Sequence, residues 1–414
     1  MEKYSRYKFS GEQWLGDIPE HWETRKAKYL FELITTPSDS SNKIGLENIE
    51  SATGRFVKTE NEFEGNGIAF QPNDIVYGKL RPYLQKVWLA DFAGNAVGDV
   101  YVLRCNENIQ PTFVKYVMLS YNFTVAADSS TYGAKMPRVS YEFIGNLKWG
   151  LPPLSEQRGI VSYLDRVTGG IDKAISHSER MIELLRERKQ IIIQQAVTKG
   201  LNPNAKLKHS GVEWIGDIPE HWEIKPLKFI IQFISGFAFD SNEFSTNGDI
   251  SVIRIGNIAE DKINYDNIAY VDKDKTLQPY LTQKGDMLIA MSGATTGKIG
   301  IDYQGGSYVN QRVGIIRSQY TKFIYYWLHT QIFKDYILFS SQGSAQPNIS
   351  AKGIENFTIC IPSKDEVDTI VNYLDKHFAD INSAIASEGR KIELLRERKQ
   401  IIINEAVTGK IKVI

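Results

Sequence analysis

The stretch SGEQWLGDIPEHWE at residues 10–23 recurs as SGVEWIGDIPEHWE at residues 210–223. The eight residues GDIPEHWE are identical in the two copies. Similarity at a fixed offset, here 200 residues in a chain of 414, is the signature of a duplicated architecture. The sequence therefore predicts a fold made of two related halves.

A second block is also duplicated, because residues 151–200 match residues 360–410 and both contain IELLRERKQIII. Between the shared blocks lie two segments, 24–150 and 224–360, that are hard to align with each other. Divergence in only one part of each copy indicates that the shared parts and the variable parts serve different purposes. The shared parts keep a common geometry, and the variable parts meet different targets.

The second shared block has the pattern of a long helix. Apolar residues alternate at spacings of four and three, which is the period of a coiled-coil seam, although a core helix of a globular domain is the alternative. The predicted seam comprises Ile171, Ile175, Ile182, Leu185, Ile192 and Ala196 in the first copy and Ile381, Ile385, Ile392, Leu395, Ile402 and Ala406 in the second. Gly169-Gly170 is expected to kink or break the first helix.

Two seam positions are polar in both copies: Ser178 and Lys189 in the first, and Glu388 and Lys399 in the second. Isolated polar core positions can fix the register of paired helices. For antiparallel packing about a pseudo-twofold axis, we expect Lys189 to face Glu388 and Ser178 to face Lys399.

The variable segments are rich in short β-type runs separated by turn residues. These runs are NDIVYG (73–78), KVWLADF (86–92), DVYVLRC (99–105), DISVIRIGNI (249–258), GDMLIAMSG (285–293) and RVGIIRS (312–318). Each segment then has one aromatic helical stretch, at 111–123 and 322–337. The predicted fold class is α+β, with two α/β domains separated by two long antiparallel coiled-coil helices in a pseudo-twofold repeat. The expected divisions are 1–150, 151–200, 201–360 and 361–414.

The composition is that of a globular protein, with 42% hydrophobic and 24% charged residues. Membrane-length apolar runs and the apolar core of a signal peptide are missing, so we expect a cytoplasmic protein without membrane contact. Cys105 and Cys360 do not occupy equivalent places in the repeat and are expected to be small buried residues. Because the net charge is zero, any DNA-binding face must be local.

Known catalytic patterns are not found. GATTGK at 293–298 is one residue short of a phosphate-binding loop, and we expect a strand-turn-strand there. His21 and His221 have no carboxylate or histidine at metal-ligand spacing, so structural roles are favoured. The Glu187–Lys189 and Glu397–Lys399 sequences lie on the predicted helices without an acidic cluster. We therefore expect a chain without catalytic residues, metal or cofactor.

Several passages in order resemble one family. They are the GDIPEHW segments, NDIVYGKLRPYL, GDMLIAMSGATTGKIG, NQRVGIIR, the stretches at 133–153 and 343–362, and LSEQRGIVSYLD running into LLRERKQIII. Over essentially its full length the chain closely resembles the specificity subunits of type I restriction-modification systems. One departure is at 363–375, where the second copy lacks the Glu-Gln found at Glu156-Gln157.

The resemblance implies that each variable segment is a target-recognition domain that reads half of a split double-stranded DNA sequence, and that the helices set the spacer. It also implies partners: two copies of an adenine methyltransferase subunit, which bind S-adenosylmethionine, and motor-nuclease restriction subunits. This chain itself would be non-catalytic.

Recognition of a DNA sequence requires hydrogen-bond donors and acceptors that loops or strands present to the base edges. Charge does not reveal them, since the first variable segment has 14 basic and 13 acidic residues and the second has 13 and 12. The first set of candidates is Lys79, Arg81, Tyr83, Thr131, Tyr132, Lys135 and Arg138. The second set is Ser292, Thr295, Thr296, Lys298, Asn310, Gln311, Arg312, Gln342, Ser344, Gln346 and Asn348.

Two other classes of function remain open at this point. A coiled-coil adapter that binds proteins or glycans would suit the neutral charge. A stand-alone nucleic-acid enzyme would need a metal or cofactor constellation.

Overall fold

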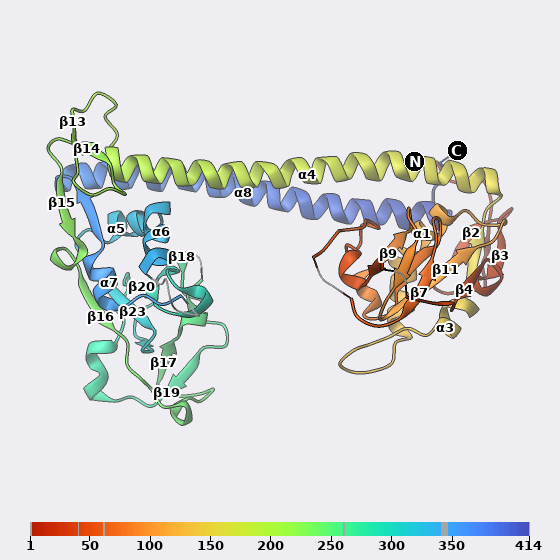
Figure 1. Cartoon of the computed structure of the whole chain (residues 1–414), viewed down its shortest axis with the longest axis horizontal. Coiled ribbons are helices and arrows are strands. Elements are labelled where there is room, and N and C mark those ends of the chain that lie inside the picture. Colours follow the sequence, from red (N-terminus) through yellow and green to blue (C-terminus); the bar gives the residue numbers. More distant parts are fainter. Residues whose placement is uncertain (1, 40, 61–62, 260, 341–346, 414) are drawn as a thin grey trace. The chain divides into compact units, whose positions relative to one another are not determined.

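The computed structural model describes residues 2–39, 41–60, 63–259, 261–340 and 347–413. The chain divides into two compact units. Unit 1 comprises Met1–Arg180 and Glu388–Ile414, and unit 2 comprises Met181–Ser387. Each unit contains one variable segment, called here the first (24–150) or second (224–360) variable domain, and parts of both long helices (Figure 1).

The two long helices, α4 (Leu154–Lys199) and α8 (Lys364–Val407), confirm the helical prediction for the second shared block. α4 continues through Gly169 and Gly170, so the predicted kink or break is wrong. The neighbouring Ile171 is 8% exposed and belongs to the core of unit 1. Such packing outweighs the cost of roughly 1 kcal/mol for each interior glycine.

The helices lie side by side and antiparallel in each unit (Figure 1). In unit 1 the Nζ atom of Lys399 lies 2.7 Å from Oδ1 of Asp172. In unit 2 the Nζ atom of Lys189 lies 3.3 Å from Oδ1 of Asn382. An offset of 210 residues converts one pair into the other, so a single contact is built twice, as a pseudo-twofold repeat requires.

The predicted register of the seam is wrong. Lys189 lies level with Asn382, which precedes Glu388 by six residues, or about 9 Å of helix. Glu388 instead lies close to Ser178, whose hydroxyl lowers the pKa of the Glu388 carboxyl. Every predicted seam residue is buried or half-buried, so the apolar period is observed although its alignment differs. The predicted register is wrong because Lys189 and Lys399 bond to Asn382 and Asp172, which are not among the polar seam positions of the opposite helix.

The described residues of unit 1 form two four-stranded sheets, two strand pairs and three short α-helices besides the long ones. The first sheet, in spatial order, is β4 (Phe31–Ile34), β11 (Val100–Cys105), β8 (Ile75–Gly78) and β9 (Val87–Leu89). The second is β5 (Pro37–Ser38), β7 (Gly67–Phe70), β10 (Gly94–Ala96) and β6 (Lys43–Ile44). The strand pairs are β1 (Tyr7–Phe9) with β2 (Asp17–Pro19) and β3 (Glu23–Lys26) with β12 (Lys148–Leu151). The helices are α1 (Pro111–Met118), α2 (Tyr121–Ser129) and α3 (Tyr141–Asn146).

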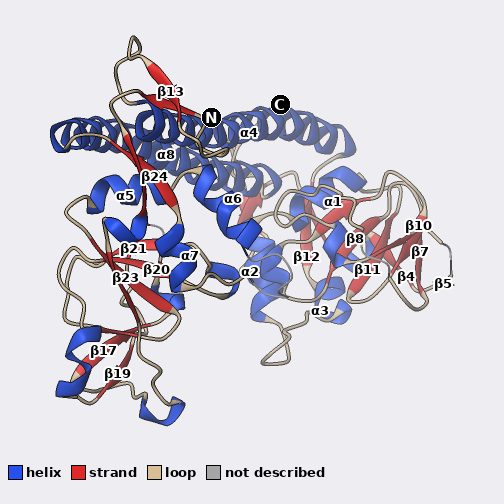
Figure 2. Ribbon diagram, turned by 60° about the vertical axis from the view of Figure 1, so that its left-hand side comes forward, coloured by secondary structure: helices blue, strands red, loops and turns tan. Residues whose placement is uncertain are grey.

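The part of unit 2 that the structure describes has a five-stranded sheet, a three-stranded sheet, strand pairs and short helices (Figure 2). The larger sheet, in spatial order, is β16 (Gln232–Ser235), β23 (Val313–Arg317), β20 (Met287–Ala290), β21 (Ile299–Ile301) and β18 (Asp261–Lys262). The smaller is β19 (Ala269–Val271), β17 (Ile250–Ile253) and β22 (Tyr308–Val309). The strand pairs are β13 (Leu207–His209) with β14 (Asp217–Pro219) and β15 (Glu223–Pro226) with β24 (Thr358–Ile361). The helices are α5 (Thr321–Leu328), α6 (Gln331–Ser340) and α7 (Ala351–Asn356).

The two variable domains share a sheet order although their sequences hardly align: β4-β11-β8-β9 in unit 1 corresponds to β16-β23-β20-β21 in unit 2. The same ion pair supports both sheets. Arg104 donates two hydrogen bonds to Asp74, and Arg317 donates two to Asp286, all 2.7–2.8 Å long. The predicted α+β class is therefore confirmed, and the two domains are copies of one design.

Each predicted aromatic helical stretch is two helices rather than one. In unit 1 Ser120 separates α1 from α2, and its hydroxyl accepts a hydrogen bond from the backbone of Phe123. In unit 2 Thr330 separates α5 from α6 and accepts from the backbone of Phe333 in the same way. Ser and Thr are preferred helix N-caps, and this capping starts a new helix at each site.

The duplicated GDIPEHW segment binds the first turn of the long helix in its own unit. The Nε2 atom of His21 lies 2.8 Å from Glu156, and that of His221 lies 2.9 Å from Glu366. Glu366 is equivalent to Glu156, so the second copy has lost only the glutamine of the Glu-Gln pair, and that site is now the buried Val367. The structural role predicted for both histidines is consistent with these contacts.

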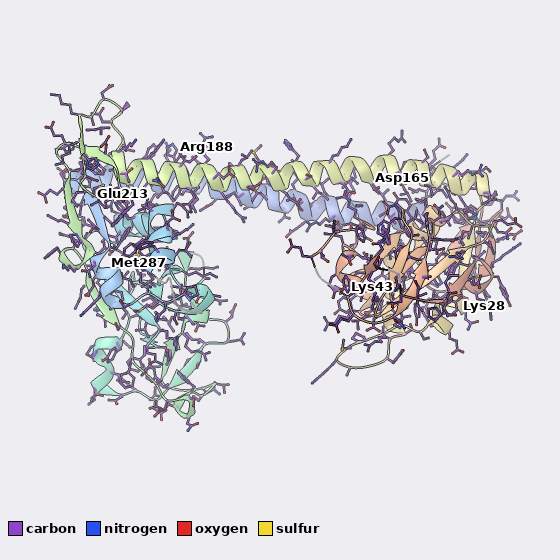
Figure 3. The ribbon with its side chains drawn as sticks, in the orientation of Figure 1. Lys28, Lys43, Asp165, Arg188, Glu213 and Met287 are labelled. Carbon is purple, nitrogen blue, oxygen red and sulfur yellow. The ribbon has the colours of Figure 1, made fainter. Side chains whose placement is uncertain are left out.

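A second duplicated contact joins each variable domain to the long helix that follows it. The hydroxyl of Tyr116 in α1 donates to Asp165 of α4 at 2.6 Å. The hydroxyl of Tyr326 in α5 donates to Asp375 of α8. Figure 3 shows Asp165 on α4 and, in the other unit, Met287 at the start of β20. Equivalent contacts of this kind keep a common geometry in domains that otherwise differ.

Candidate nucleic-acid interface

In unit 1 the structure brings the two predicted loops together. The turn after β8 begins at Lys79, and the second loop covers 131–138. The backbone N–H of Arg81 donates to the carbonyl of Pro137 at 2.7 Å, and the N–H of Val139 donates to the carbonyl of Lys79 at 3.1 Å. Residues 56 and 60 positions apart in sequence are therefore in contact, and the two loops form one surface.

Asp99, which the sequence analysis did not single out, organises this surface. Nη2 and Nε of Arg138 donate to the Asp99 carboxylate at 2.7 and 2.9 Å, and these bonds lower the pKa of that carboxyl. The Nζ atom of Lys79 lies 3.8 Å from the same carboxylate. Arg138 and Lys79 thus hold the two loops in place, and their charge is partly neutralised. In the sequence, the only indication of this role is that the acidic residue Asp99 directly precedes strand β11.

Three of the predicted residues in unit 1 are exposed at this surface. Arg81 has a left-handed backbone with φ of 50° and precedes the short 3-10 turn that begins at Pro82. Tyr132 is 61% exposed, and Lys135 is exposed as well. Thr131 is half-buried, and its hydroxyl donates to a backbone carbonyl in the preceding helix, which is a structural role.

In unit 2 the three predicted segments also meet. Ser292, after β20, forms a β-bridge with Asn348, and the N–H of Gly293 donates to the carbonyl of Pro347 at 3.0 Å. Nη1 of Arg312 donates to the hydroxyl of Ser292 at 3.0 Å. The predicted residues Gln342, Ser344 and Gln346 lie outside the residues that the structure describes.

The predicted residues of unit 2 divide into accessible and structural ones. The exposed residues are Lys298, Gln311, Arg312 and Asn348, and Asn310 is half-buried. Ser292 is 4% exposed. The hydroxyls of Thr295 and Thr296 donate to backbone carbonyls within the turn, at 3.5 and 2.7 Å. This turn joins antiparallel β20 and β21, which confirms the strand-turn-strand prediction for GATTGK.

The two surfaces occupy equivalent places in the shared sheet order. Each begins at the turn that follows the third strand in that order, β8 or β20, and each is completed by the loop that leads to α3 or α7. The basic side chains differ: Arg81 and Lys135 are exposed in unit 1, whereas Lys298 and Arg312 are exposed in unit 2. We call this surface, made by the turn after β8 or β20 and the loop that leads to α3 or α7, the platform of each domain. The two platforms have equivalent positions but present different hydrogen-bond donors.

Other chemistries find little support in the described residues. No group of three or more His, Cys, Asp and Glu side chains among them is arranged to hold a metal ion. Burial raises the pKa of the Cys105 thiol to about 12, and burial also raises the pKa of Cys360. Thiols of this kind are poor nucleophiles.

Within the described ranges, every helix is too short or too polar to cross a bilayer.

Each unit also has a groove where its variable domain meets the helix pair, with volumes of about 720 and 700 Å³. Helix residues at equivalent positions line both grooves: Asp172, Ile175, Lys399 and Gln400 in unit 1, and Asn382, Ile385, Lys189 and Gln190 in unit 2. Tyr83, a predicted DNA-binding residue, lines the groove of unit 1 and is 51% exposed. It therefore faces the helices.

The groove of unit 2 contains a charged cluster around Asp261. Its carboxylate lies 3.1 Å from Nε2 of His329 and 4.0 Å from Nζ of Lys189, and it accepts a hydrogen bond from the hydroxyl of Tyr325. Burial raises the pKa of Asp261, but the hydrogen bonds from His329 and Tyr325 outweigh that effect and bring the pKa to about 2.

This shift predicts an acid-dependent contribution to stability. An aspartate whose folded pKa lies below its unfolded value of about 3.9 stabilises the fold above that value, and the contribution is lost as the pH falls towards the folded pKa. We expect Asp261→Asn to lower the free energy of unfolding in urea at neutral pH. The difference from wild type should shrink between about pH 4 and pH 2. Asp266→Asn, at an exposed position of the same domain, is the control. A difference that is independent of pH would contradict the assignment.

The comparisons agree with the duplicated design. The family model for the type I restriction modification DNA specificity domain matches residues 19–179 and 219–393. The MjaVIII specificity subunit of Methanocaldococcus jannaschii is 30% identical over 296 residues, covering 69% of this chain and 67% of the relative. The putative MjaX specificity subunit of the same organism is 24% identical and covers 96% of both chains.

Solved structures show the same fold. A chain from work on complex assembly and conformational transition of the type I R-M system has a TM-score of 0.74 at 17% identity, covering 94% of this chain and 98% of that one. The HsdS subunit of Thermoanaerobacter tengcongensis has a TM-score of 0.52 at 18% identity, covering 95% and 98%. With two matched domains on most of its length, this chain belongs to the type I restriction-modification DNA specificity family.

Proposed function

We propose that this chain reads a bipartite DNA sequence, with each variable domain reading one half and the helix pair setting the spacer. The observation that carries the proposal is the duplicated platform. Two loops meet after the same strand of the same sheet order in both domains, yet the exposed donors on them differ. Two geometrically equal sites with unequal side chains suit two different half-sites.

The exposed residues have the chemistry that base and phosphate recognition requires. Arg and Lys donate to guanine and to phosphates, and Asn and Gln bind adenine. Unit 1 offers Arg81, Lys135 and Tyr132, and unit 2 offers Lys298, Gln311, Arg312 and Asn348. Since the chain has a net charge of zero, these local groups would supply the attraction to DNA.

We also propose that two methyltransferase subunits, which would bind S-adenosylmethionine, and restriction subunits assemble on this chain in the cytoplasm, and that catalysis belongs to those partners. Duplicated exposed apolar residues on the helices support two copies of one partner. Leu184 and Ile191 of α4 are 43% and 56% exposed, and their equivalents Leu394 and Ile401 of α8 are 55% and 49% exposed. The two residues of each pair are seven positions apart and therefore lie on one face of their helix, and exposed apolar patches mark protein interaction sites.

A coiled-coil adapter for proteins or glycans remains the second candidate, favoured only by the neutral charge. An electrophoretic mobility assay separates the two. The chain co-expressed with its methyltransferase subunit should retard target DNA in the presence of excess random competitor DNA. Absence of any retardation would favour the adapter, and retardation that random DNA abolishes would indicate only non-specific binding.

The same assay tests the platform residues. We expect Arg81→Ala and Lys135→Ala each to weaken specific binding about fivefold or more, because a lost base or phosphate contact costs roughly 1–3 kcal/mol. Lys173→Ala, at an exposed position of α4, is the matched control and should bind normally. Wild-type affinity in both platform variants would show that the DNA lies elsewhere.

A further inference from the structure

The helix pair carries one poorly exposed lysine at the equivalent position of each helix. Lys399 of α8 is 7% exposed, and the side chain of Lys189 of α4 is 16% exposed. An ammonium group with so little access to water requires acceptors from the protein. The acceptors that bind these two lysines are therefore required by the structure around them.

In unit 1 one carboxylate joins three segments. Oδ1 of Asp172 lies 2.7 Å from Nζ of Lys399, and Oδ2 lies 2.9 Å from Nη2 of Arg55. Asp172 belongs to α4, Lys399 to α8 and Arg55 to the first variable domain. Both helices and the domain meet at this single side chain.

In unit 2 the same link is built with the carboxylate on the other partner. The equivalent of Asp172 is Asn382, which carries no charge. The second variable domain supplies the acid instead, because Asp261 lies 4.0 Å from Lys189. Lys189 also bonds Asn382 and lies 4.8 Å from the ring centre of Phe378. Although the acid has changed position, the lysine keeps a carboxylate that links it to its variable domain.

These links differ from the other contacts described above. The His–Glu contacts hold the GDIPEHW segments, and the Tyr–Asp contacts hold the variable domains, to the N-terminal part of the long helix that follows in sequence. The lysine comes from the opposite helix of the pair. In unit 1 the backbone N–H of Asn122 also donates to Oδ1 of Asn404 in α8 at 3.0 Å, so the Lys399 cluster is the charged part of a wider attachment to both helices. Attachment at more than one level of the helix pair restrains the tilt of a domain.

We propose that Lys399 and Lys189 are positioning residues that fix the tilt of each variable domain on the helix pair, and thereby restrict recognition to one spacer length. The proposal rests on the proposed function as a two-part DNA reader. A domain that can tilt reaches half-sites one base pair nearer or farther, so loss of the link widens the range of accepted spacers.

The test uses the full chain in complex with its methyltransferase subunit. Methylation rates are measured on DNA molecules that share both half-sites and differ by one base pair in the spacer. In Lys399→Met the preference for the cognate spacer falls about tenfold, as expected from the loss of a poorly exposed charge contact. Arg396→Met is the matched control, because it removes an ion pair with Glu179 between the helices and leaves the Asp172 cluster intact.

Further variants distinguish positioning from general stability. Asp172→Asn relaxes the spacer preference as Lys399→Met does, and the double variant is no worse than either one. Lys399→Arg retains the preference. If Lys399→Met fails to fold, Arg55→Met, at an exposed residue, removes the link to the domain only. In unit 2, Lys189→Met and Asp261→Asn have the same effect as each other.

The outcomes are separable. If the wild type and the Lys399→Met and Arg55→Met variants all have the same strong preference for one spacer length, the proposed positioning role is overturned. A uniform loss of methylation with an unchanged spacer ratio also overturns it, since that result indicates a merely structural role. A wild type that accepts all spacers refutes the ruler in the proposed function instead.

Discussion

Exchanging residues 24–150 for the corresponding segment of a relative is expected to change one half of the methylated sequence and to leave the other half as it was. The physical reason is that the exposed donors of the first platform lie within that segment. The second platform lies in the other unit and is untouched by the exchange.

The strand register makes this exchange structurally mild. Thr24 and Gly150 are direct partners in the β3–β12 pair, so both ends of the segment meet at one point. Ile224 and Cys360 are the equivalent partners in the β15–β24 pair. A graft at these positions replaces a domain whose two ends are already side by side. The donor segment should keep a tyrosine at the place of Tyr116, because the bond to Asp165 crosses the junction.

Methylome sequencing of cells that express the hybrid subunit and its methyltransferase partner is the measurement. The reciprocal exchange of 224–360 is the control and should change the opposite half. If either exchange altered both halves, or if neither altered any, the two domains would not be independent readers.

The repeat and the helix period were sufficient to predict the architecture. Identity between GDIPEHWE copies marks the halves, and a spacing of four and three marks α4 and α8. These are local patterns in sequence, so they are visible without structure. The N-caps Ser120 and Thr330 were visible too, and taking them into account would have divided each aromatic stretch correctly.

The register of the two long helices and the ion pairs that support the platforms could not be predicted in this way, because they depend on residues distant in sequence. Lys189 lies level with Asn382 and finds its acid in Asp261, which belongs to a variable domain. Asp99 holds Arg138, 39 residues away, and this contact separates a supporting arginine from the exposed Arg81. Pairing polar seam positions only with one another ignored partners from outside the helices.

Deleting one heptad from each long helix, residues 179–185 together with 389–395, is expected to shorten the unread spacer by roughly three base pairs. The length that changes is the interval along each helix between its two residues that take part in the Lys399 and Lys189 contacts. Asp172 and Lys189 are 17 residues apart in α4, and Asn382 and Lys399 are 17 residues apart in α8. Equal deletions reduce both intervals to ten, so the two contacts remain compatible with one antiparallel pair.

Seven residues of helix correspond to about 10 Å, and base pairs rise by about 3.4 Å each. The apolar seam keeps its phase because a whole heptad is removed. Three base pairs also rotate one half-site by roughly 100°, given 10–10.5 base pairs per turn, so methylation should be slower unless the DNA twists or bends to compensate. Methylome sequencing should reveal both original half-sites at the shorter separation. A variant that deletes 179–185 alone is the control and should lose activity, since only one of the two lysine contacts can then form. An active double deletion with an unchanged spacer would show that the helices are not the ruler.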